Sequence, residues 1–354
     1  MMPSCALLKP GEIIDGKYSI TRMVGSGGMA VVYEAVHMRL AQRVALKILL
    51  PELSRVGDVV LRFQREARAA AQLRSLHAAR VFDADKLPDG TPYIVMEFLD
   101  GHDLATVLAA RGSLPVGEAV DYVMQACHAM AEAHRLGTVH RDLKPSNLFL
   151  VQEGHQTIVK VVDFGVSMVA DDGLVSRITR TDAALGTALY MSPEQVRSAK
   201  DVDARTDVWA LGVVLFELLT PYSPFVGETA AARAASIVAD RPRRLCTLRP
   251  DVPPDLERIV MRALEKEQEN RFQNAGEFGA ALALFAKSPV GRSSQDAFAM
   301  PSKPISWSQD GTRYSLLSRT AGAHSSAAPP FAGKMRAKFS LPFSVFRGGK
   351  RRGD

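Results

Sequence analysis

The sequence predicts an α+β protein of two lobes: a small lobe of antiparallel strands with one helix, followed by a larger, mainly helical lobe. Three observations support this fold class. Runs of β-branched residues broken by glycine or polar turns fill residues 17–102. A stretch rich in Ala, Arg and Glu interrupts them at 58–74 and predicts a helix. From Leu104 onward, helical apolar periodicity replaces the strand pattern.

Four strands are predicted in the small lobe, at 18–25, 30–38, 43–50 and 93–101, the last running out into a loop. LPDG, at 87–90, is typical of a turn.

Four helices are predicted in the larger lobe, at 116–136, 207–220, 228–240 and 255–265. The second contains the longest apolar run of the chain. That run is shorter than the ~18 residues of a membrane span and carries Glu217. It therefore predicts a buried core helix.

The composition changes after Ala286, where Ser, Pro, Gly and Arg become frequent and periodicity disappears. We therefore expect a lead-in at 1–17, one domain at 18–286 and a disordered tail at 287–354. Within the domain, the lobes would cover about 18–99 and 100–286.

The positive charge of the chain is concentrated in its tail. Residues 288–354 contain eleven Lys and Arg but three Asp and Glu, which leaves 33 basic and 35 acidic residues before them. Since the net charge of +6 comes from the tail, it does not indicate a nucleic-acid-binding protein.

The stretch 334–352 interleaves these cations with Phe339, Phe343 and Phe346, which suits weak contact with an anionic membrane or a partner. A solvated end is the plainer alternative.

The cysteines favour a reduced, cytoplasmic setting. Cys5, Cys127 and Cys246 are odd in number, far apart and without metal-ligand spacing. The first residues, MMPSCALLKPGEIIDG, hold no apolar run of the length a secretory leader needs.

A glycine-rich segment, VGSGGMAVV at 24–32, lies between the first two predicted strands. Because strand alternation follows it, the glycines are expected at a hairpin tip whose backbone N–H groups can approach phosphates. An ordinary glycine-rich turn is the alternative.

Two charged residues occupy apolar settings in the small lobe. Lys47 lies between apolar neighbours in its strand, and Glu66 lies on the apolar side of the helix at 58–74. A buried ammonium is costly unless it is paired, so we expect these two side chains to form an ion pair. Taken singly, each could be a surface charge.

The segment HRDLKPSNLFL, at 140–150, gathers groups suited to phosphoryl transfer. It contains the carboxylate of Asp142, the ammonium of Lys144 and the amide of Asn147, and a second carboxylate, Asp163, follows a β-branched run. One base, one phosphate-binding cation and two oxygen ligands for a hard metal are what this chemistry needs.

These motifs resemble, in order and spacing, those of Ser/Thr protein kinases, most closely the bacterial eukaryotic-like (Hanks-type) family. The resemblance covers roughly residues 18–286. It rests on GSGGMAVVY, VALK, REARAAAQL, PYIVMEFLDG, HRDLKPSN, DFG, GTALYMSPEQ, TDVWALGVVLFELL and Arg271.

The resemblance implies a bilobal protein-kinase fold that transfers the γ-phosphoryl group of Mg-ATP to Ser or Thr hydroxyls of protein substrates, with Mn²⁺ as a substitute metal. Asp142 would accept or orient the hydroxyl proton, and Lys144 would contact the γ-phosphate. Asn147 and Asp163 would hold the metal. Lys144 and Thr187 fit Ser/Thr rather than Tyr specificity.

For ATP itself, the resemblance implies that Lys47, paired with Glu66, contacts the α- and β-phosphates. Glu97 and Leu99 would offer backbone groups to adenine. The other nucleotide-lining positions would be Val24, Gly25, Ser26, Gly27, Gly28, Met29, Ala30, Val31, Val32, Ala45, Met96, Asp103 and Leu148. Of these, Val32, Ala45 and Leu148 would sandwich the adenine, and Asp103 would reach the ribose. Plain core packing is an equal alternative for Met96.

The segment 163–194 would be the activation loop. We predict autophosphorylation on Thr179 and Thr181 within a transient homodimer, because a phosphate there could pair with Arg141 and order the loop. The alternative is that these are ordinary loop hydroxyls.

Three further residue groups are expected to be structural. His140 would pack, acid or base work being the alternative, and Glu194 would pair with Arg271. Asp207 would cap its helix, fasten the catalytic-loop backbone as the resemblance implies, or both.

The chain departs from the family pattern at Ala30, at the missing Pro-Asn after His77, at SPE for APE and at Pro221, none of which is catalytic.

The rival hypotheses are a pseudokinase scaffold, a small-molecule phosphotransferase of related fold and a nucleic-acid binder.

Overall fold

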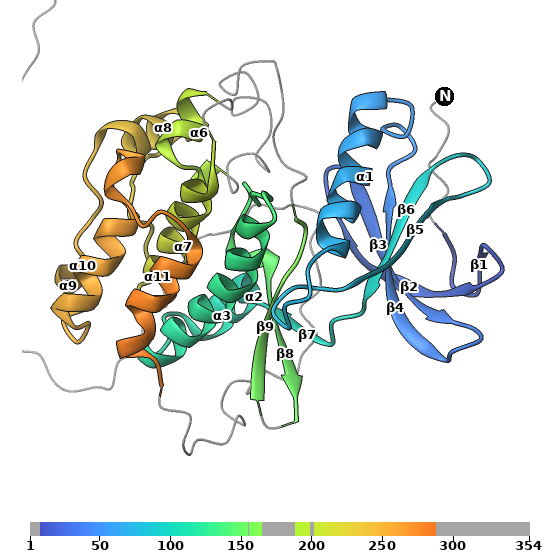
Figure 1. Cartoon of the computed structure of the whole chain (residues 1–354), viewed down its shortest axis with the longest axis horizontal. Coiled ribbons are helices and arrows are strands. Elements are labelled where there is room, and N and C mark those ends of the chain that lie inside the picture. The colour runs from blue at the N-terminus through green and yellow to red at the C-terminus, as the bar shows by residue number, and fades with distance from the viewer. Residues whose placement is uncertain (1–7, 155, 165–187, 199–201, 288–354) are drawn as a thin grey trace, which may run out of the picture. The chain divides into compact units, whose positions relative to one another are not determined.

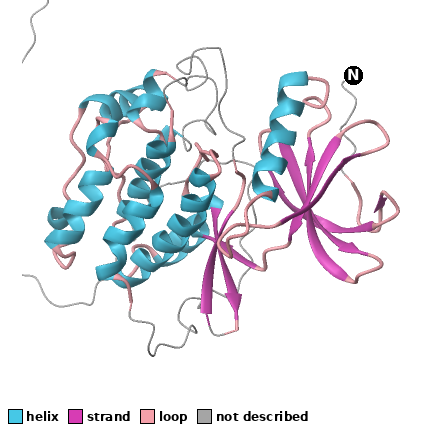
Figure 2. Cartoon of the chain, viewed as in Figure 1, coloured by secondary structure: helices cyan, strands magenta, loops and turns pink. Residues whose placement is uncertain are grey.

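The computed structural model describes residues 8–154, 156–164, 188–198 and 202–287. These residues fold into two antiparallel sheets and a set of helices (Figures 1 and 2). The predicted α+β class, with a β-rich lobe followed by a helical lobe, is confirmed. The predicted phosphosites and the basic tail lie outside the described residues.

The small lobe contains a six-stranded antiparallel sheet with the strand order β1-β2-β3-β4-β6-β5. Its strands are β1 (Ile13–Ile14), β2 (Tyr18–Ser26), β3 (Ala30–His37), β4 (Gln42–Leu49), β5 (Val81–Lys86) and β6 (Pro92–Glu97). Because side chains alternate between the two faces of a sheet, β4 supplies two cores. Leu46 packs with Tyr33 and Val95 on one face, and Leu49 packs with Ile94 on the other.

Helix α1 (Gly57–Ala71) covers the second of these faces. Its buried residues, Phe63, Glu66, Ala67 and Ala70, recur at helical spacing, so one stripe faces the sheet. The predicted helix at 58–74 is confirmed, although it ends at Ala71.

A small three-stranded sheet, β7 (Gly101–Asp103), β8 (Leu148–Glu153) and β9 (Gln156–Val161), carries the central motifs. A Cβ at Gly101 would clash with the carbonyl oxygen of Leu150, so β7 can approach β8 only with glycine there. The strand predicted at 93–101, running out into a loop, is β6, which ends at Glu97; the loop then leads to β7.

The large lobe packs its helices around α7 (Ala204–Leu219), which is buried along nearly its whole length. A Cβ at Gly212 would lie 2.9 Å from the Cβ of Ala263, so glycine lets α7 and α10 pack closely. The other helices are α2 (Leu104–Arg111), α3 (Val116–Arg135), α6 (Pro193–Arg197), α8 (Ala230–Ala239), α9 (Leu245–Leu248), α10 (Pro254–Ala263) and α11 (Ala275–Leu282). Single 3₁₀ turns are η1 (Pro145–Asn147), η2 (Ala188–Tyr190), η4 (Gln268–Asn270) and η5 (Ala283–Phe285).

All four predicted helices of this lobe are present, each within three residues of its expected start and end. Of the helices in the described ranges, none combines the length and apolar character that crossing a membrane requires.

Candidate active site

The glycine-rich segment forms the tip of the β2–β3 hairpin, as predicted. β2 ends at Ser26, β3 begins at Ala30, and the Gly27 amide donates to the Ala30 carbonyl at 2.9 Å. A Cβ at Gly25 or Gly28 would meet nothing within 4 Å. The fold itself would therefore have room for a side chain at both positions. Glycine instead leaves the backbone accessible to a ligand.

Strand register places four of the predicted nucleotide-lining residues on one face of the large sheet. Val32 is opposite Lys47, and Ala45 is opposite Met96. Ala45 and Lys47 are two residues apart in β4, so both pairs project to the same side. This is also the side that α1 covers.

Lys47 connects the two lobes. Its Nζ lies 2.7 Å from Oε1 of Glu66 on α1 and 2.9 Å from Oδ1 of Asp163, which follows β9. The Lys47 side chain is only 7% exposed, so its buried ammonium needs a partner that offsets the loss of water. The predicted ion pair with Glu66 is present, and a second carboxylate joins it.

The two carboxylates differ in their environments. Burial raises the pKa of Glu66 to about 7 against the attraction of Lys47, and its Oε2 has no hydrogen-bond partner among the described residues. Burial also opposes ionisation of Asp163, but the charge and hydrogen bond of Lys47 outweigh it and lower its pKa. Burial likewise disfavours the charged form of Lys47, yet Asp163 and Glu66 raise its pKa overall. Asp163 is therefore the more readily ionised of the two carboxylates.

The catalytic-loop residues come together as predicted. Lys144 Nζ lies 2.9 Å from Oδ2 of Asp142, and the Asn147 side-chain amide donates to the Asp142 carbonyl at 2.8 Å. Asn147 ends the η1 turn just before β8. Because its Nδ2 is engaged by Asp142, its Oδ1 is the atom suited to a metal.

Asp207 holds the backbone of this loop. Its fully buried carboxylate accepts the amide protons of His140 and Arg141, each at 2.9 Å, and lies 2.9 Å from Nε2 of His134. Arg141 has a φ of 66°, so the carboxylate stabilises a strained backbone. The fastening role is confirmed, whereas the N-cap role is wrong, since Asp203 caps α7 by accepting from the Arg205 amide.

His140 is structural, as predicted. It is fully buried, its ring centroid is 5.3 Å from that of Phe164, and its Nε2 lies 2.9 Å from the Val162 carbonyl. Phe164 lies next to Asp163 and, together with Met96 and Glu66, lines a cavity of about 20 Å³ behind the Lys47 ion pairs.

Two of the residues expected to contact adenine or ribose, Glu97 and Asp103, already have hydrogen-bond partners in the fold. The Glu97 amide donates to the Arg80 carbonyl at 2.8 Å, so its carbonyl is the group it can offer a nucleotide. Asp103 caps α2 by accepting from the amide and the hydroxyl of Thr106, at 2.9 and 2.8 Å. Leu148 is fully buried, and Leu99 is half-buried.

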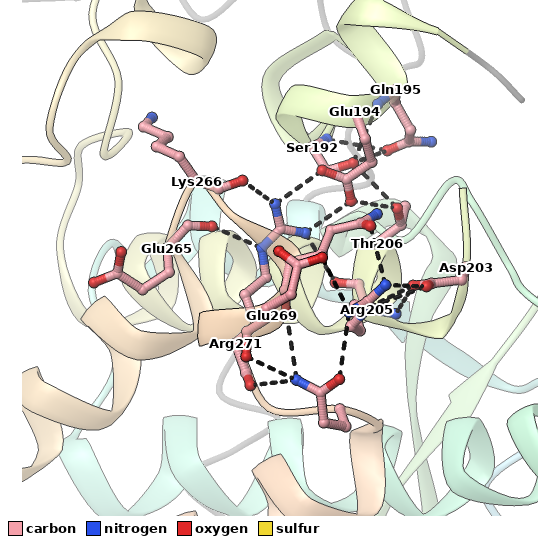
Figure 3. A network of polar contacts seen from close by, with 12 residues as sticks. Ser192, Glu194, Gln195, Asp203, Arg205, Thr206, Glu265, Lys266, Glu269 and Arg271 are labelled. Carbon is pink, nitrogen blue, oxygen red and sulfur yellow. Dashed lines mark hydrogen bonds and ion pairs between the residues drawn. The ribbon is translucent and has the colours of Figure 1, made fainter. Parts of the chain in front are cut away.

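The predicted Glu194–Arg271 pair lies in a network in the large lobe, shown in Figure 3. The Arg271 guanidinium is fully buried and bidentate to Glu194 at 2.7 and 2.8 Å, and it also donates to the backbone carbonyls of Glu265 and Lys266. Nearby, Gln195 donates to the Arg141 carbonyl at 2.8 Å, which links this network to the catalytic loop.

Lys160 is a buried lysine that was not among the predicted site residues. It lies in β9, its side chain is 3% exposed, and it pairs with Glu97 at 3.0 Å. The sequence does contain a signal, since a lysine within IVKVV must be paired if that run is buried. Its partner is 63 residues away, so no local spacing could identify it.

The sequence matches the protein kinase domain family over residues 18–278, and the chain therefore belongs to the protein kinase family. Among its relatives, the serine/threonine-protein kinase PknB of Mycolicibacterium smegmatis is 39% identical over 76% of this chain and 43% of that protein. PknB of Mycobacterium leprae is 38% identical over the same two shares. The chain thus spans less than half the length of these relatives.

A solved structure supports the same assignment. The crystal structure of the Mycobacterium tuberculosis PknI kinase domain is similar with a TM-score of 0.62 and 29% identity. The similarity covers 79% of this chain and all of that one.

Proposed function

We propose that this chain is an active serine/threonine protein kinase that transfers the γ-phosphoryl group of Mg-ATP to protein hydroxyls. The observation that carries the proposal is the contact of Lys47 with both Glu66 and Asp163. It joins the predicted phosphate-binding cation to a predicted metal ligand from a motif 116 residues away. In kinases, productive chemistry requires the Lys–Glu ion pair together with a metal ion bound by the aspartate.

The side chains have distinct roles in this proposal. Asp142 orients the substrate hydroxyl and accepts its proton, while Lys144, 2.9 Å away, holds the oxygens of the transferring group. Lys47 holds the α- and β-phosphates. A hydroxyl aligned by Asp142 needs no stronger base, because phosphoryl transfer depends mainly on positioning and charge stabilisation.

The metal site would consist of the carboxylate of Asp163 and the amide oxygen of Asn147. Both are hard oxygen ligands, and Asp163 is 42% exposed and kept ionised by Lys47. When bound, a divalent cation neutralises the phosphate charge. We favour Mg²⁺, with Mn²⁺ as a substitute, because Mg²⁺ commonly binds through one or two protein ligands together with phosphate oxygens.

Serine/threonine specificity is supported by the names of the relatives, PknB among them. The pseudokinase alternative is disfavoured because Lys47, Asp142, Asn147 and Asp163 are all present. Lys47 also contacts Glu66, and Asp142 contacts both Lys144 and Asn147. The cytoplasmic setting and the domain division at 18–286 also belong to the proposal, the former resting on the unpaired Cys127 and Cys246.

The test is an incubation of the purified chain with Mg²⁺, labelled ATP and a mixture of unfolded protein substrates, followed by phosphoamino-acid analysis. The wild type should label Ser and Thr, and Asp142→Asn should not. Equal labelling by both proteins, or labelling of small molecules alone, would refute the proposal.

We also propose that the kinase phosphorylates itself on Thr179 and Thr181, with Arg141 as receiver of the phosphate. Arg141 supports this because it lies next to Asp142, and its backbone is fixed at both ends by Asp207 and Gln195. Phosphopeptide mapping of active enzyme should find both threonines modified. Active protein with neither threonine modified would contradict this regulation.

A further inference from the structure

Lys160 is a buried lysine that the proposed chemistry does not use. It lies in β9 between Val159 and Val161, which are fully buried. Its Nζ lies 3.0 Å from Oε1 and 3.2 Å from Oε2 of Glu97, and 3.7 Å from Oε1 of Glu153. The ammonium therefore faces both carboxylate oxygens of Glu97.

Stability alone does not explain a lysine at this position. Taking an ammonium out of water is costly, and a well-packed apolar residue often replaces a buried ion pair without loss of stability. What the lysine adds is a second anchor for the carboxylate of Glu97, which is 24% exposed.

Glu97 is the last residue of β6, where the chain leaves the large sheet. Its amide donates to the Arg80 carbonyl at 2.8 Å, and its Oε2 accepts the Arg80 amide at 3.2 Å. Side chain and main chain of Glu97 are thus both fixed to the same neighbouring residue.

The strand that carries Lys160 also holds the segment before Arg80. The Ala79 amide donates to the Val161 carbonyl at 3.0 Å, and the Val161 amide donates to the His77 carbonyl at 2.8 Å. The His77 ring lies 3.1 Å from the Val159 carbonyl. Residues 159–161 therefore hold 77–79 by the backbone and Glu97 by the Lys160 side chain.

We infer that Lys160 is a positioning residue that sets the orientation of the Glu97 peptide, and with it the carbonyl offered to adenine. The inference rests on the proposed function, because it assumes that this carbonyl contacts the base. Lys160 itself touches neither nucleotide nor substrate. Its effect should therefore appear in binding of the adenine part of ATP and not in binding of the phosphates.

The experiment measures adenosine and Mg-triphosphate affinities by calorimetry for the wild type, Lys160→Met, Lys160→Arg and Glu97→Gln. Lys160→Met keeps the length of the side chain and removes its charge. We expect it to weaken adenosine about tenfold, equivalent to about 1.4 kcal/mol, and to leave triphosphate within about twofold. Lys160→Arg should restore adenosine affinity to within about threefold, since it can pair bidentately.

Two controls separate positioning from general damage. Arg244→Met removes an ion pair with the buried Glu257, 2.8 Å long, and should leave both affinities unchanged. Glu97→Gln tests the same contact from the other side if Lys160→Met fails to fold. In the double variant the two losses should not add, because they remove one interaction.

Adenosine affinity within twofold of wild type in both single variants overturns the inference, as does an equal loss of adenosine and triphosphate binding. If the wild type binds adenosine but transfers no phosphate, the proposed function fails while the inference stands. A wild type that binds neither ligand refutes both.

Discussion

Lys47 lies between two carboxylates that are suited to different tasks. Glu66 is buried and keeps one oxygen without a partner among the described residues, whereas Asp163 is 42% exposed and has a lowered pKa. A carboxylate that stays ionised and reaches solvent can accept a metal. A buried one can only hold the lysine in place. The structure therefore assigns charge to Asp163 and position to Glu66.

This difference predicts unequal effects of substitution. Lys47→Met should lower kcat/KM by about 100-fold or more, because a fixed charge on the phosphates is lost. Glu66→Gln should cost about tenfold, since the amide can still accept from Lys47. Steady-state kinetics with ATP as the varied substrate measures both. Lys47→Met within threefold of wild type would exclude the assigned phosphate contact.

At this scale, the sequence identified residues whose local surroundings are incompatible with a lone charge. Lys47 and Glu66 both lie in apolar patterns, so an ion pair between them could be predicted. Lys160 is also a charge in an apolar pattern, but its partner Glu97 lies in the other lobe at the end of a strand. Such a partner can be identified only once the arrangement of the strands is known.

Helix α7 shows how element boundaries decide the role of a residue. DVDARTDVW offers three aspartates that could precede an apolar helix. Because the helix begins at Ala204, Asp203 becomes the cap, and Asp207, one turn later, points inward to the catalytic loop. The apolar pattern starts only at Val208, so sequence periodicity placed the start too late.

Matched substitutions separate the two aspartates. Asp203→Asn should change the unfolding free energy by less than about 1 kcal/mol and kcat by less than twofold, since Asn caps as well as Asp. Asp207→Asn turns a donor toward the buried amides of His140 and Arg141. It should cost about 2 kcal/mol and lower kcat at least tenfold. Equal behaviour of the two variants in denaturant titrations and rate assays would argue against this division of roles.

The ion pair between α6 and Arg271 predicts a pH dependence of stability. Burial opposes the charge of Glu194, but the hydrogen bonds and charge of Arg271 lower its pKa from 4.5 to about 2. A lowered folded-state pKa means that the ionised group stabilises the fold above pH 4.5 and that this stabilisation is lost toward pH 2.

Glu194→Gln should therefore be less stable than wild type by ~3 kcal/mol near neutral pH, and the difference should shrink as the pH falls from 4.5 toward 2. Denaturant unfolding of both proteins across this range measures it. A difference that does not vary with pH would show that the pair contributes through packing and not through charge.

For the molecule as a whole, the tail should be dispensable to catalysis. Lys287, the last residue described, still contacts α3 through Asp121 and Glu118. Deleting 288–354 should therefore leave the unfolding midpoint and kcat nearly unchanged, with kcat within about twofold. If the tail contacts membranes, vesicles with anionic lipid should sediment the full chain and not the shortened one. No dependence on anionic lipid would remove that role.

The overall architecture could be predicted because long apolar helices and β-branched runs carry strong periodic signals. Edge strand β5, VFDADK, was not predicted, because five of its six residues are exposed and three are charged. Hydrogen bonds to the neighbouring strand β6, and not an apolar pattern, hold this edge strand in the sheet. The three-stranded sheet escaped prediction for a similar reason, since Gly101 marks a close approach to β8 that only the fold defines.

The central claim, that Asp142 is the base of a working kinase, is tested most directly by comparing Asp142→Asn with wild type for both ATP affinity and single-turnover phosphoryl transfer. The claim predicts an ATP Kd within about threefold and a transfer rate lower by about 10²–10⁴-fold. A transfer rate within tenfold of wild type, with ATP still bound, would contradict it.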